Sequence, residues 1–231
     1  MKHVRVDIIS DIMCPWCLIG WLKFQQVMAH YADQLAFDVR WRPFELNPAM
    51  PADGVNAAEY LAQRYGLSPA KGSANRQNIA STAAALGFDI NWGADFRMRN
   101  SFNGHRLLSW AEAVDDQPEL AGKARGTKQM ALKLALFRAH FSEGRDVNDA
   151  ATLAEIAASV GLDAGKARAI LAGDDYGDIV RSQQAEWQDH GISAVPTFLL
   201  EQRMMVPGAQ DPDVFIRVID RKILAASAEA G

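Results

Sequence analysis

The sequence predicts an α/β fold in which a βαβ unit and a ββα unit are separated by a long helical block. Three observations support this fold class. Apolar and polar residues alternate on both sides of a helical pattern in residues 1–46, helical periodicity dominates residues 47–189, and apolar strand patterns return in residues 190–231. The parallel pair of the first unit and the hairpin of the last predict a mixed sheet.

The first unit is predicted from the change of periodicity along the chain. Residues 4–8 alternate between apolar and polar, residues 18–31 carry apolar residues at helical spacing, and residues 35–41 alternate again. The strict alternation of 35–41 predicts a strand at a sheet edge. Strand, helix and strand in succession predict a right-handed βαβ unit.

The middle and the end of the chain follow from the same signals. We find no convincing strand in 47–189, and this block is too long for a simple crossover, so we interpret it as an all-helical insertion into a core made of 1–46 and 190–231. Residues 195–200 ("VPTFLL") are nearly all apolar, which predicts a central strand, and the short "EQR" segment predicts a hairpin. Asp211 and Pro212 predict the start of a final helix.

Composition restricts the class of function. The net charge is −4 and the chain has no run of lysine or arginine, which argues against a nucleic-acid partner. The N-terminus enters a strand pattern directly, and no long uncharged apolar stretch follows, so we expect a cytoplasmic protein with no membrane partner. In that compartment a cysteine pair is typical of catalysis or metal binding rather than of a structural disulfide.

The chain has two cysteines, Cys14 and Cys17, in the sequence "CPWC" at the junction of the first strand and helix. Residues three apart are neighbours on a helix. The unpaired N–H groups and the dipole at the helix start favour a thiolate, so we expect a lowered pKa and a nucleophilic role for Cys14. Cys17, one turn further in, is the expected resolving thiol. Pro15 can begin the helix and Trp16 offers an apolar flank, so both shape the thiolate's surroundings.

Two other interpretations of the cysteines remain open. A zinc site needs four ligands, and the histidines are scattered without a close pair, which argues against a metal. Two inert core cysteines are also possible, since free cysteine is often buried, but the spacing after a strand favours a redox motif. A second signal is "GISAVPTF", in which proline begins an apolar strand. A cis Val195–Pro196 bond would reconcile proline with that position.

With "SDIMCPWC", "GISAVPTFLL" and the "GAQ" that follows, nearly the whole chain resembles the DsbA-like branch of the thioredoxin superfamily. Within it the chain is similar to FrnE-type dithiol oxidoreductases, which are related to 2-hydroxychromene-2-carboxylate isomerases and kappa-class glutathione transferases. "NSFNGHRLLSWA" and "ALFRAHFSEGRDVND" are supporting features. The resemblance implies a thioredoxin-like core with a helical insertion and a cis proline packed beside the redox pair.

The resemblance also implies where substrate binds. A disulfide-bearing peptide or glutathione would lie along the backbone of Val195 as an added strand, next to Pro196. Glutathione is therefore a candidate co-substrate, and no permanently bound cofactor is expected. The helix start at "GAQD" can receive a carboxylate, although for Asp211 taken alone a plain helix cap is the favoured explanation. The complete set of expected substrate-binding residues is Ser10, Pro15, Trp16, Phe44, Asn100, Arg106, Val195, Pro196, Gln210 and Asp211.

One departure from the resemblance concerns proton transfer. Many thioredoxin-like proteins have a buried carboxylate six residues before the first cysteine, a place that Ile8 occupies here. Asp7 should point to the other face of the sheet, and Asp11 lies in the loop. The residue that exchanges a proton with Cys17 is therefore unassigned, and water is one candidate.

The leading hypothesis is a cytoplasmic thiol–disulfide oxidoreductase or isomerase that acts on protein or small-thiol substrates. A glutathione-dependent isomerase or transferase is the alternative, and a non-catalytic binding module is a third. Relatives of the second kind generally lack a full CxxC pair, which favours the first. Homodimers occur among relatives, but no sequence feature identifies an interface.

Overall fold

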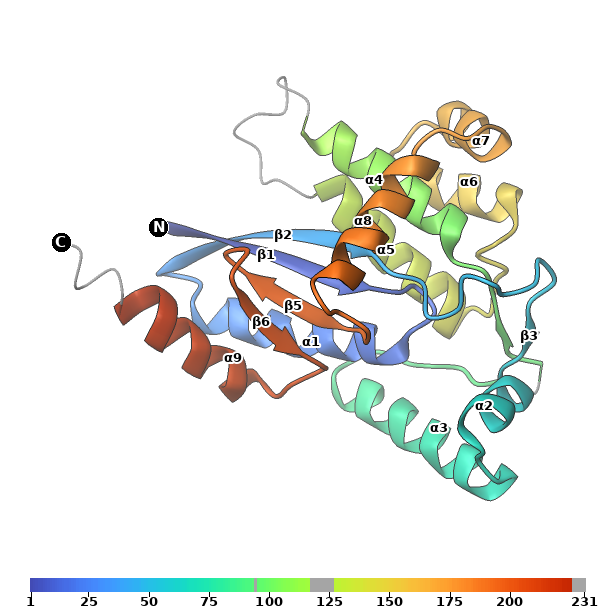
Figure 1. Cartoon of the computed structure of the whole chain (residues 1–231), viewed down its shortest axis with the longest axis horizontal. Helices are drawn as coiled ribbons and strands as arrows, with labels where there is room; N and C mark the ends of the chain where they lie inside the picture. Colours follow the sequence, from blue (N-terminus) through green and yellow to red (C-terminus); the bar gives the residue numbers. More distant parts are fainter. Residues whose placement is uncertain (94, 117–126, 226–231) are drawn as a thin grey trace.

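The structure is a computed structural model that describes residues 1–93, 95–116 and 127–225. In this part of the chain the main sheet has the strand order β2-β1-β5-β6 (Figure 1). The strand β1 (Lys2–Ser10) pairs in parallel with β2 (Leu35–Pro43) across the helix α1 (Pro15–His30). The strand β5 (Thr197–Leu200) is central and antiparallel to both β1 and β6 (Met204–Pro207). The predicted mixed sheet of a βαβ and a ββα unit is confirmed.

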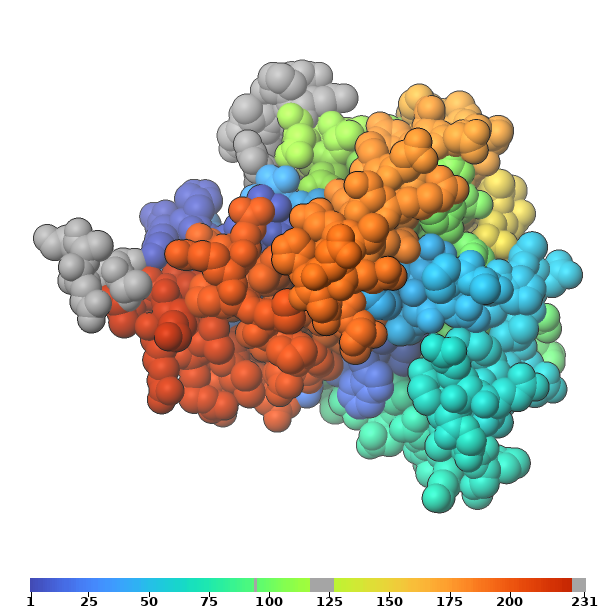
Figure 2. Space-filling view, viewed as in Figure 1, coloured from blue at the N-terminus to red at the C-terminus, as the bar shows by residue number. Residues whose placement is uncertain are grey.

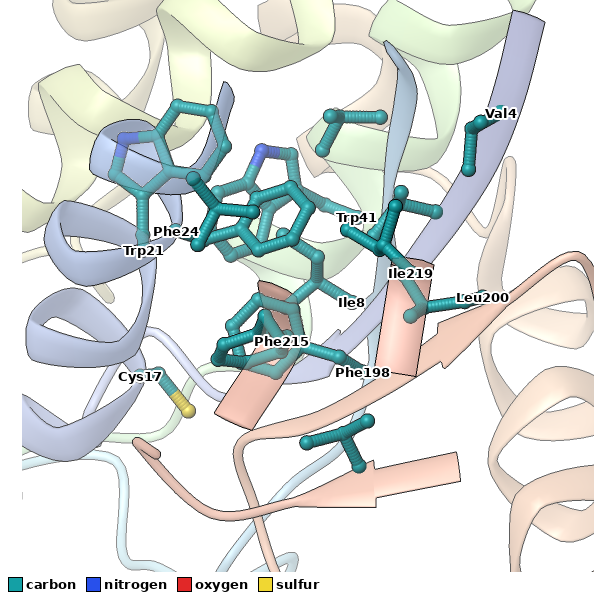
Figure 3. Packing of buried hydrophobic residues seen from close by; sticks show 14 of the residues in the cluster. Val4, Ile8, Cys17, Trp21, Phe24, Trp41, Phe198, Leu200, Phe215 and Ile219 are labelled. Carbon is teal, nitrogen blue, oxygen red and sulfur yellow. The ribbon is translucent and has the colours of Figure 1, made fainter. Parts of the chain in front are cut away.

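The helices α1 and α9 (Pro212–Ile219) pack together beside this sheet, and a π-helical turn, Asp220–Leu224, follows α9. Their apolar faces are closed by aromatic contacts. The ring of Phe24 lies 5.3 Å from that of Phe198 and 5.2 Å from that of Phe215. Burial of such rings is a large part of the free energy that stabilises a small sheet. Figure 3 shows this cluster with Cys17 at its margin.

The segment between β2 and β5 is mostly helical, as predicted. Its elements surround one end of the sheet, with α2 and α3 set apart from α4, α6 and α7 (Figure 1). In chain order they are β3 (Val55–Asn56), α2 (Ala57–Tyr65), α3 (Pro69–Ala85), β4 (Arg97–Met98), α4 (Phe102–Asp115), α5 (Thr127–Phe137) with a π-helical turn at Arg138–Ser142, α6 (Ala150–Ser159), α7 (Ala164–Ala172) and α8 (Gly177–Asp189).

The prediction that this segment contains no strand is wrong in one detail. The strands β3 and β4 pair antiparallel, with Val55 opposite Met98. Each has two residues, which is too short for an alternating pattern to be visible in the sequence. The proposed boundaries 1–46, 47–189 and 190–231 stay a prediction, and residues 94, 117–126 and 226–231 of those ranges lie outside the described residues.

Helix α5 covers the edge strand β2, and this contact positions the insertion on the sheet. The Gln129 side chain accepts a hydrogen bond from the Trp41 N–H at 2.9 Å and donates to the Trp41 carbonyl at 3.1 Å. The amide thereby satisfies backbone groups that an uncovered edge would leave open. Trp41 and Arg42 of the edge strand are consequently buried.

The chain passes between two hydrophobic cores directly before the cysteines. Ile12 and Met13 belong to the core of the insertion, whereas Cys14 and Cys17 belong to the core of the sheet. A third, smaller cluster joins Phe44 after β2 to Trp187 of α8. Figure 2 shows α8 in orange at the surface, beside the light-blue segment that follows β2. The cysteine pair therefore lies at the boundary between the core of the sheet and the core of the insertion.

Candidate active site

The two cysteines lie at the start of α1, where β1 ends and the chain turns. Cys14 is the N-cap residue with extended backbone, Pro15 is the first helical residue, and the Cys17 N–H donates to the Cys14 carbonyl at 3.0 Å. No side chain caps this helix start. Among the N–H groups of the first turn, that of Cys17 also acts on the Cys14 thiol and lowers its pKa, although other effects outweigh it.

The two sulfurs differ in access. Cys14 is 4% exposed and Cys17 is fully buried, and both are free thiols. Trp16 between them is 37% exposed, and Pro15 is half-buried. An incoming sulfur can therefore reach only Cys14 from outside, with Trp16 as an apolar surface beside it.

The peptide bond between Val195 and Pro196 is cis, the isomer that the sequence favoured. The Sγ of Cys14 lies 3.7 Å from the Val195 carbonyl oxygen, which is close enough for a weak contact between the thiol and this loop. Gly20 permits the close approach of α1, because a Cβ there would lie 3.1 Å from Cγ of Pro196. The loop before β5 is thereby held against the cysteine pair.

The loop between β1 and α1 is fixed by a buried carboxylate, Asp11. Its oxygens accept hydrogen bonds from the Met13 N–H at 3.0 Å and from the Leu46 N–H at 2.7 Å. His105 Nε2, from α4, lies 3.8 Å from Asp11 Oδ1 and 3.1 Å from the Phe44 carbonyl. Burial raises the pKa of Asp11, but His105 and the two N–H groups outweigh burial, and the pKa is lowered. A negative charge is thus fixed beside the cysteines.

The charge of the thiol pair is distributed differently from the sequence prediction. The pKa of Cys14 is raised well above its ordinary value, first because its thiol is hydrogen-bonded to Cys17 and then because it is buried. Burial also raises the pKa of Cys17, but the hydrogen bond from Cys14, the Lys133 ammonium and the Ser10 hydroxyl outweigh it, so that pKa is lowered. The expectation of a lowered pKa at Cys14 is wrong, since the pair shares one negative charge that the surrounding groups favour on Cys17.

Lys133 of α5 is the residue that the sequence-based selection missed. Its side chain is fully buried, and its Nζ has no hydrogen-bond partner. The Nζ lies 5.1 Å from the ring centroid of Trp41 and 4.7 Å from that of Phe137. The available signal was its position in "ALKLALF", four residues after Gln129 and four before Phe137, both of which are buried.

Of the predicted cleft residues Ser10 and Phe44, the structure places Ser10 at the cysteine pair and Phe44 in a neighbouring cluster. Ser10 ends β1, is fully buried and acts on the Cys17 thiol. Phe44 is 8% exposed and packs with Trp187 and Ile192, so only its backbone carbonyl reaches the His105 side chain. Asp7 lies on the other face of the sheet, as predicted, where it binds Arg42 at 2.6 Å.

Two other predicted residues are engaged elsewhere. The Asn100 side chain accepts from the Phe102 N–H at 2.9 Å and contacts the Pro48 carbonyl at 3.5 Å. Arg106 does not face the cysteine pair. Its guanidinium donates to the carbonyls of Ile170, Gly173 and Asp175 and to Asn103 Oδ1, which fixes the C-terminal end of α7 to α4.

The segment before α9 differs in detail from its prediction. Gln210 Nε2 donates to the Pro207 carbonyl at 2.8 Å. Asp211 occupies the N-cap position, but its carboxylate pairs with Lys23 Nζ at 2.7 Å and caps no N–H group. The expectation of a plain helix cap at Asp211 is therefore wrong. Both side chains are exposed, so they are accessible to a ligand.

Among residues 1–93, 95–116 and 127–225, no group of three or more metal-ligating side chains occurs. Within the same ranges, every helix is too short or too polar to cross a membrane.

A dithiol at a helix start beside a cis proline, in a thioredoxin-like sheet, defines the thiol–disulfide oxidoreductases. The chain belongs to the DSBA-like thioredoxin domain family, which it matches over residues 5–220. It is 33% identical to the probable DsbA oxidoreductase SCO1869 from Streptomyces coelicolor, over 95% of this chain and 89% of that one, with a TM-score of 0.83. The predicted DsbA-like family and the class of enzyme are confirmed, whereas the FrnE type within that family stays a prediction.

Two more distant structures share the fold. A 2-hydroxychromene-2-carboxylate isomerase is 14% identical, with a TM-score of 0.66 and coverage of 98% of this chain and 99% of that chain. The cytosolic disulfide reductase DsbM from Pseudomonas aeruginosa, in a structure with GSH, is 19% identical, with a TM-score of 0.61 and coverage of 94% and 99%. The helical insertion is thus part of the shared architecture.

Proposed function

We propose that this protein exchanges disulfides with protein or small-thiol substrates in the cytoplasm, through the dithiol of Cys14 and Cys17. The observation that carries the proposal is the contact of 3.7 Å between Cys14 Sγ and the Val195 carbonyl. It sets the accessible sulfur beside a loop whose backbone can pair with an extended substrate. Val195 and Pro196 then position the substrate disulfide, and Trp16 contacts its apolar side chains.

The exchange proceeds in two balanced steps. Cys14 gives its proton to the Cys17 thiolate and attacks one substrate sulfur, while the other leaves with its electron pair and takes a proton from solvent. Cys17 then loses its proton and attacks Sγ of Cys14, so that the bond between Cys14 and the substrate breaks and the second substrate sulfur is protonated. The substrate disulfide gains two electrons, and the dithiol becomes a disulfide.

Glutathione is the proposed co-substrate that restores the dithiol. The DsbM structure with GSH supports this choice, since DsbM has the same fold. The exposed side chains of Gln210 and Asp211 are the candidate partners of the tripeptide near α9. The cytoplasmic location is supported by the use of only two cysteines, both in the redox pair, as is typical of proteins in a reducing compartment.

Reduction of insulin disulfides, with glutathione as the electron source, tests the proposal. Cys14→Ser should abolish turnover, because no accessible sulfur remains. Cys17→Ser should accumulate a mixed disulfide at Cys14, visible by mass, because the resolving thiol is missing. Full activity in Cys14→Ser would overturn the proposal. Activity on an isomerase substrate that survives Cys17→Ala would instead favour the glutathione-dependent isomerase.

A further inference from the structure

Lys133 has a chemical environment that packing alone does not explain. A methionine or leucine could fill the space under Trp41 and Phe137 without burying an amine. Instead, a fully buried Nζ lies against two ring faces with no hydrogen-bond partner. An isolated buried charge is strongly unfavourable, so such a group calls for a functional explanation.

Packing connects this amine to the redox pair. Lys133 lies over Trp41, whose ring contacts that of Trp21 at 5.5 Å, and Trp21 is one turn after Cys17 on α1. Cys17, Trp21, Trp41 and Phe137 belong to one buried cluster. Figure 3 shows Cys17 and the two tryptophans within it. The amine therefore enters, from the insertion, the same core that contains the inaccessible sulfur.

Charged and titratable groups approach the amine from β2, α1, α4 and the loop between β1 and α1. The thiols of Cys17 and Cys14 and the Asp11 carboxylate act on it. His105 and Arg42 line the same narrow crevice. Arg42 is already paired with Asp7 and Glu112, and Asp11 accepts two backbone hydrogen bonds. Cys17 is the acid among these groups that must lose a proton during exchange.

We propose that Lys133 is a positioning residue for the resolving thiol, whose positive charge favours the thiolate of Cys17 from within the core that both share. The inference rests on the proposed dithiol function. The Nζ of Lys133 has no hydrogen-bond partner, so it acts on Cys17 through the low-dielectric core and not by direct proton transfer. The Cys17 proton passes to solvent, and the Cys17 thiolate then attacks Cys14 to form the disulfide.

The charge state of the amine suits this role. Burial lowers the pKa of Lys133 to about 8, against the opposing effects of Cys17, Asp11 and Cys14. The amine is therefore still mostly protonated at neutral pH, and a positive charge near a thiol favours its thiolate.

The first test measures the Cys17 thiol without any substrate. In a Cys14→Ala background, the thiolate absorbance of Cys17 is titrated with pH, with and without Lys133→Met. We expect the substitution to raise the pKa of Cys17 by about one unit or more, a change of at least tenfold in acidity. The control is Lys128→Met, on the same helix, where the amine bonds the Val160 and Gly161 carbonyls instead. An unchanged Cys17 titration in Lys133→Met would overturn the proposal.

The second test follows resolution in the intact dithiol protein. Glutathione is loaded on Cys14, and its release by Cys17 is timed as a function of pH. Lys133→Met should slow release by roughly tenfold near neutral pH, and the deficit should shrink as the pH rises toward the thiol pKa. Lys133→Gln serves as a second variant if Lys133→Met does not fold. If the parent reduces insulin and releases glutathione at the same rate as Lys133→Met, the role of Lys133 is wrong but the proposed function stands. If the parent shows no disulfide exchange, the proposed function itself is wrong.

Discussion

The insertion buries two cations in opposite ways. Arg106 of α4 is 5% exposed, and its guanidinium donates to three backbone carbonyls and one side-chain oxygen. Lys133 of α5 is fully buried without a hydrogen bond. The first arrangement joins two helices and satisfies buried polar groups. The second leaves the cation dependent on the charge of the nearby thiols, so its protonation can change with their redox state.

The largest expected effect is the loss of the satisfied cation. Arg106→Met should destabilise the fold by roughly 3 kcal/mol or more, because the carbonyls of Ile170, Gly173 and Asp175 lose their donor. Chemical denaturation gives the free energy of unfolding. The pKa of Cys17 should be the same in Arg106→Met as in the parent. A shifted pKa of Cys17 would mean that Arg106 also acts on the thiol pair, as Lys133 does. Arg106→Lys should recover only part of the loss, since lysine lacks the planar fork of donors.

Lys133→Met should change stability in the opposite direction. The folded-state pKa of Lys133 is about 8, below its ordinary value of 10.5, so between these pH values the unfolded chain holds a proton that the folded chain lacks. The penalty is fully present below pH 8 and disappears as the pH rises to 10.5. Removing the amine should therefore stabilise the reduced protein by roughly 2 to 3 kcal/mol at neutral pH, with the gain lost in alkali.

Urea denaturation of the reduced Lys133→Met protein at neutral and alkaline pH would measure this gain. A variant less stable than the parent at neutral pH would show that the amine stabilises the fold, and the contrast with Arg106 would then fail. The combination of higher stability and slower resolution is the outcome that supports a functional lysine.

His140 is a third buried base, and it extends the comparison because its side chain packs against aromatic rings and not against the thiols. His140 Nε2 has no hydrogen-bond partner, and the ring lies 4.8 Å from that of Phe96. Burial lowers its pKa from 6.5 to about 3, so the folded protein loses stability as the pH falls through this window. Between neutral pH and pH 5, the parent should lose about 2 kcal/mol of unfolding free energy through His140, and the His140→Phe variant should not lose this amount.

Denaturation of the His140→Phe variant at the two pH values gives this difference, and glutathione release from Cys14 should be unchanged. Slower release would show that His140 also acts on the resolving thiol. An equal acid sensitivity of the variant and the parent would mean that other groups control the acid transition.

The sequence by itself determined the cysteine pair, the order of the elements and the family. These features depend on short-range physics: residues three apart meet at a helix start, and the periodicity of apolar residues separates helix from strand. The position of Pro196 before an apolar strand likewise predicted the loop beside the pair. The sequence did not predict the contacts of single side chains. Arg106 binds carbonyls at the end of α7 and does not face the cysteine pair, and the Asp211 carboxylate pairs with Lys23 instead of capping its helix.

Only the tertiary structure decided which groups surround the sulfurs. Lys133 lies more than a hundred residues from Cys17 in the chain, and His105 is similarly distant from Asp11. Their approach depends on the docking of α4 and α5 on the edge strand, through contacts such as Gln129 with Trp41. The favoured position of the thiolate within the pair depends on these contacts and on burial, because charges interact through space and not along the chain.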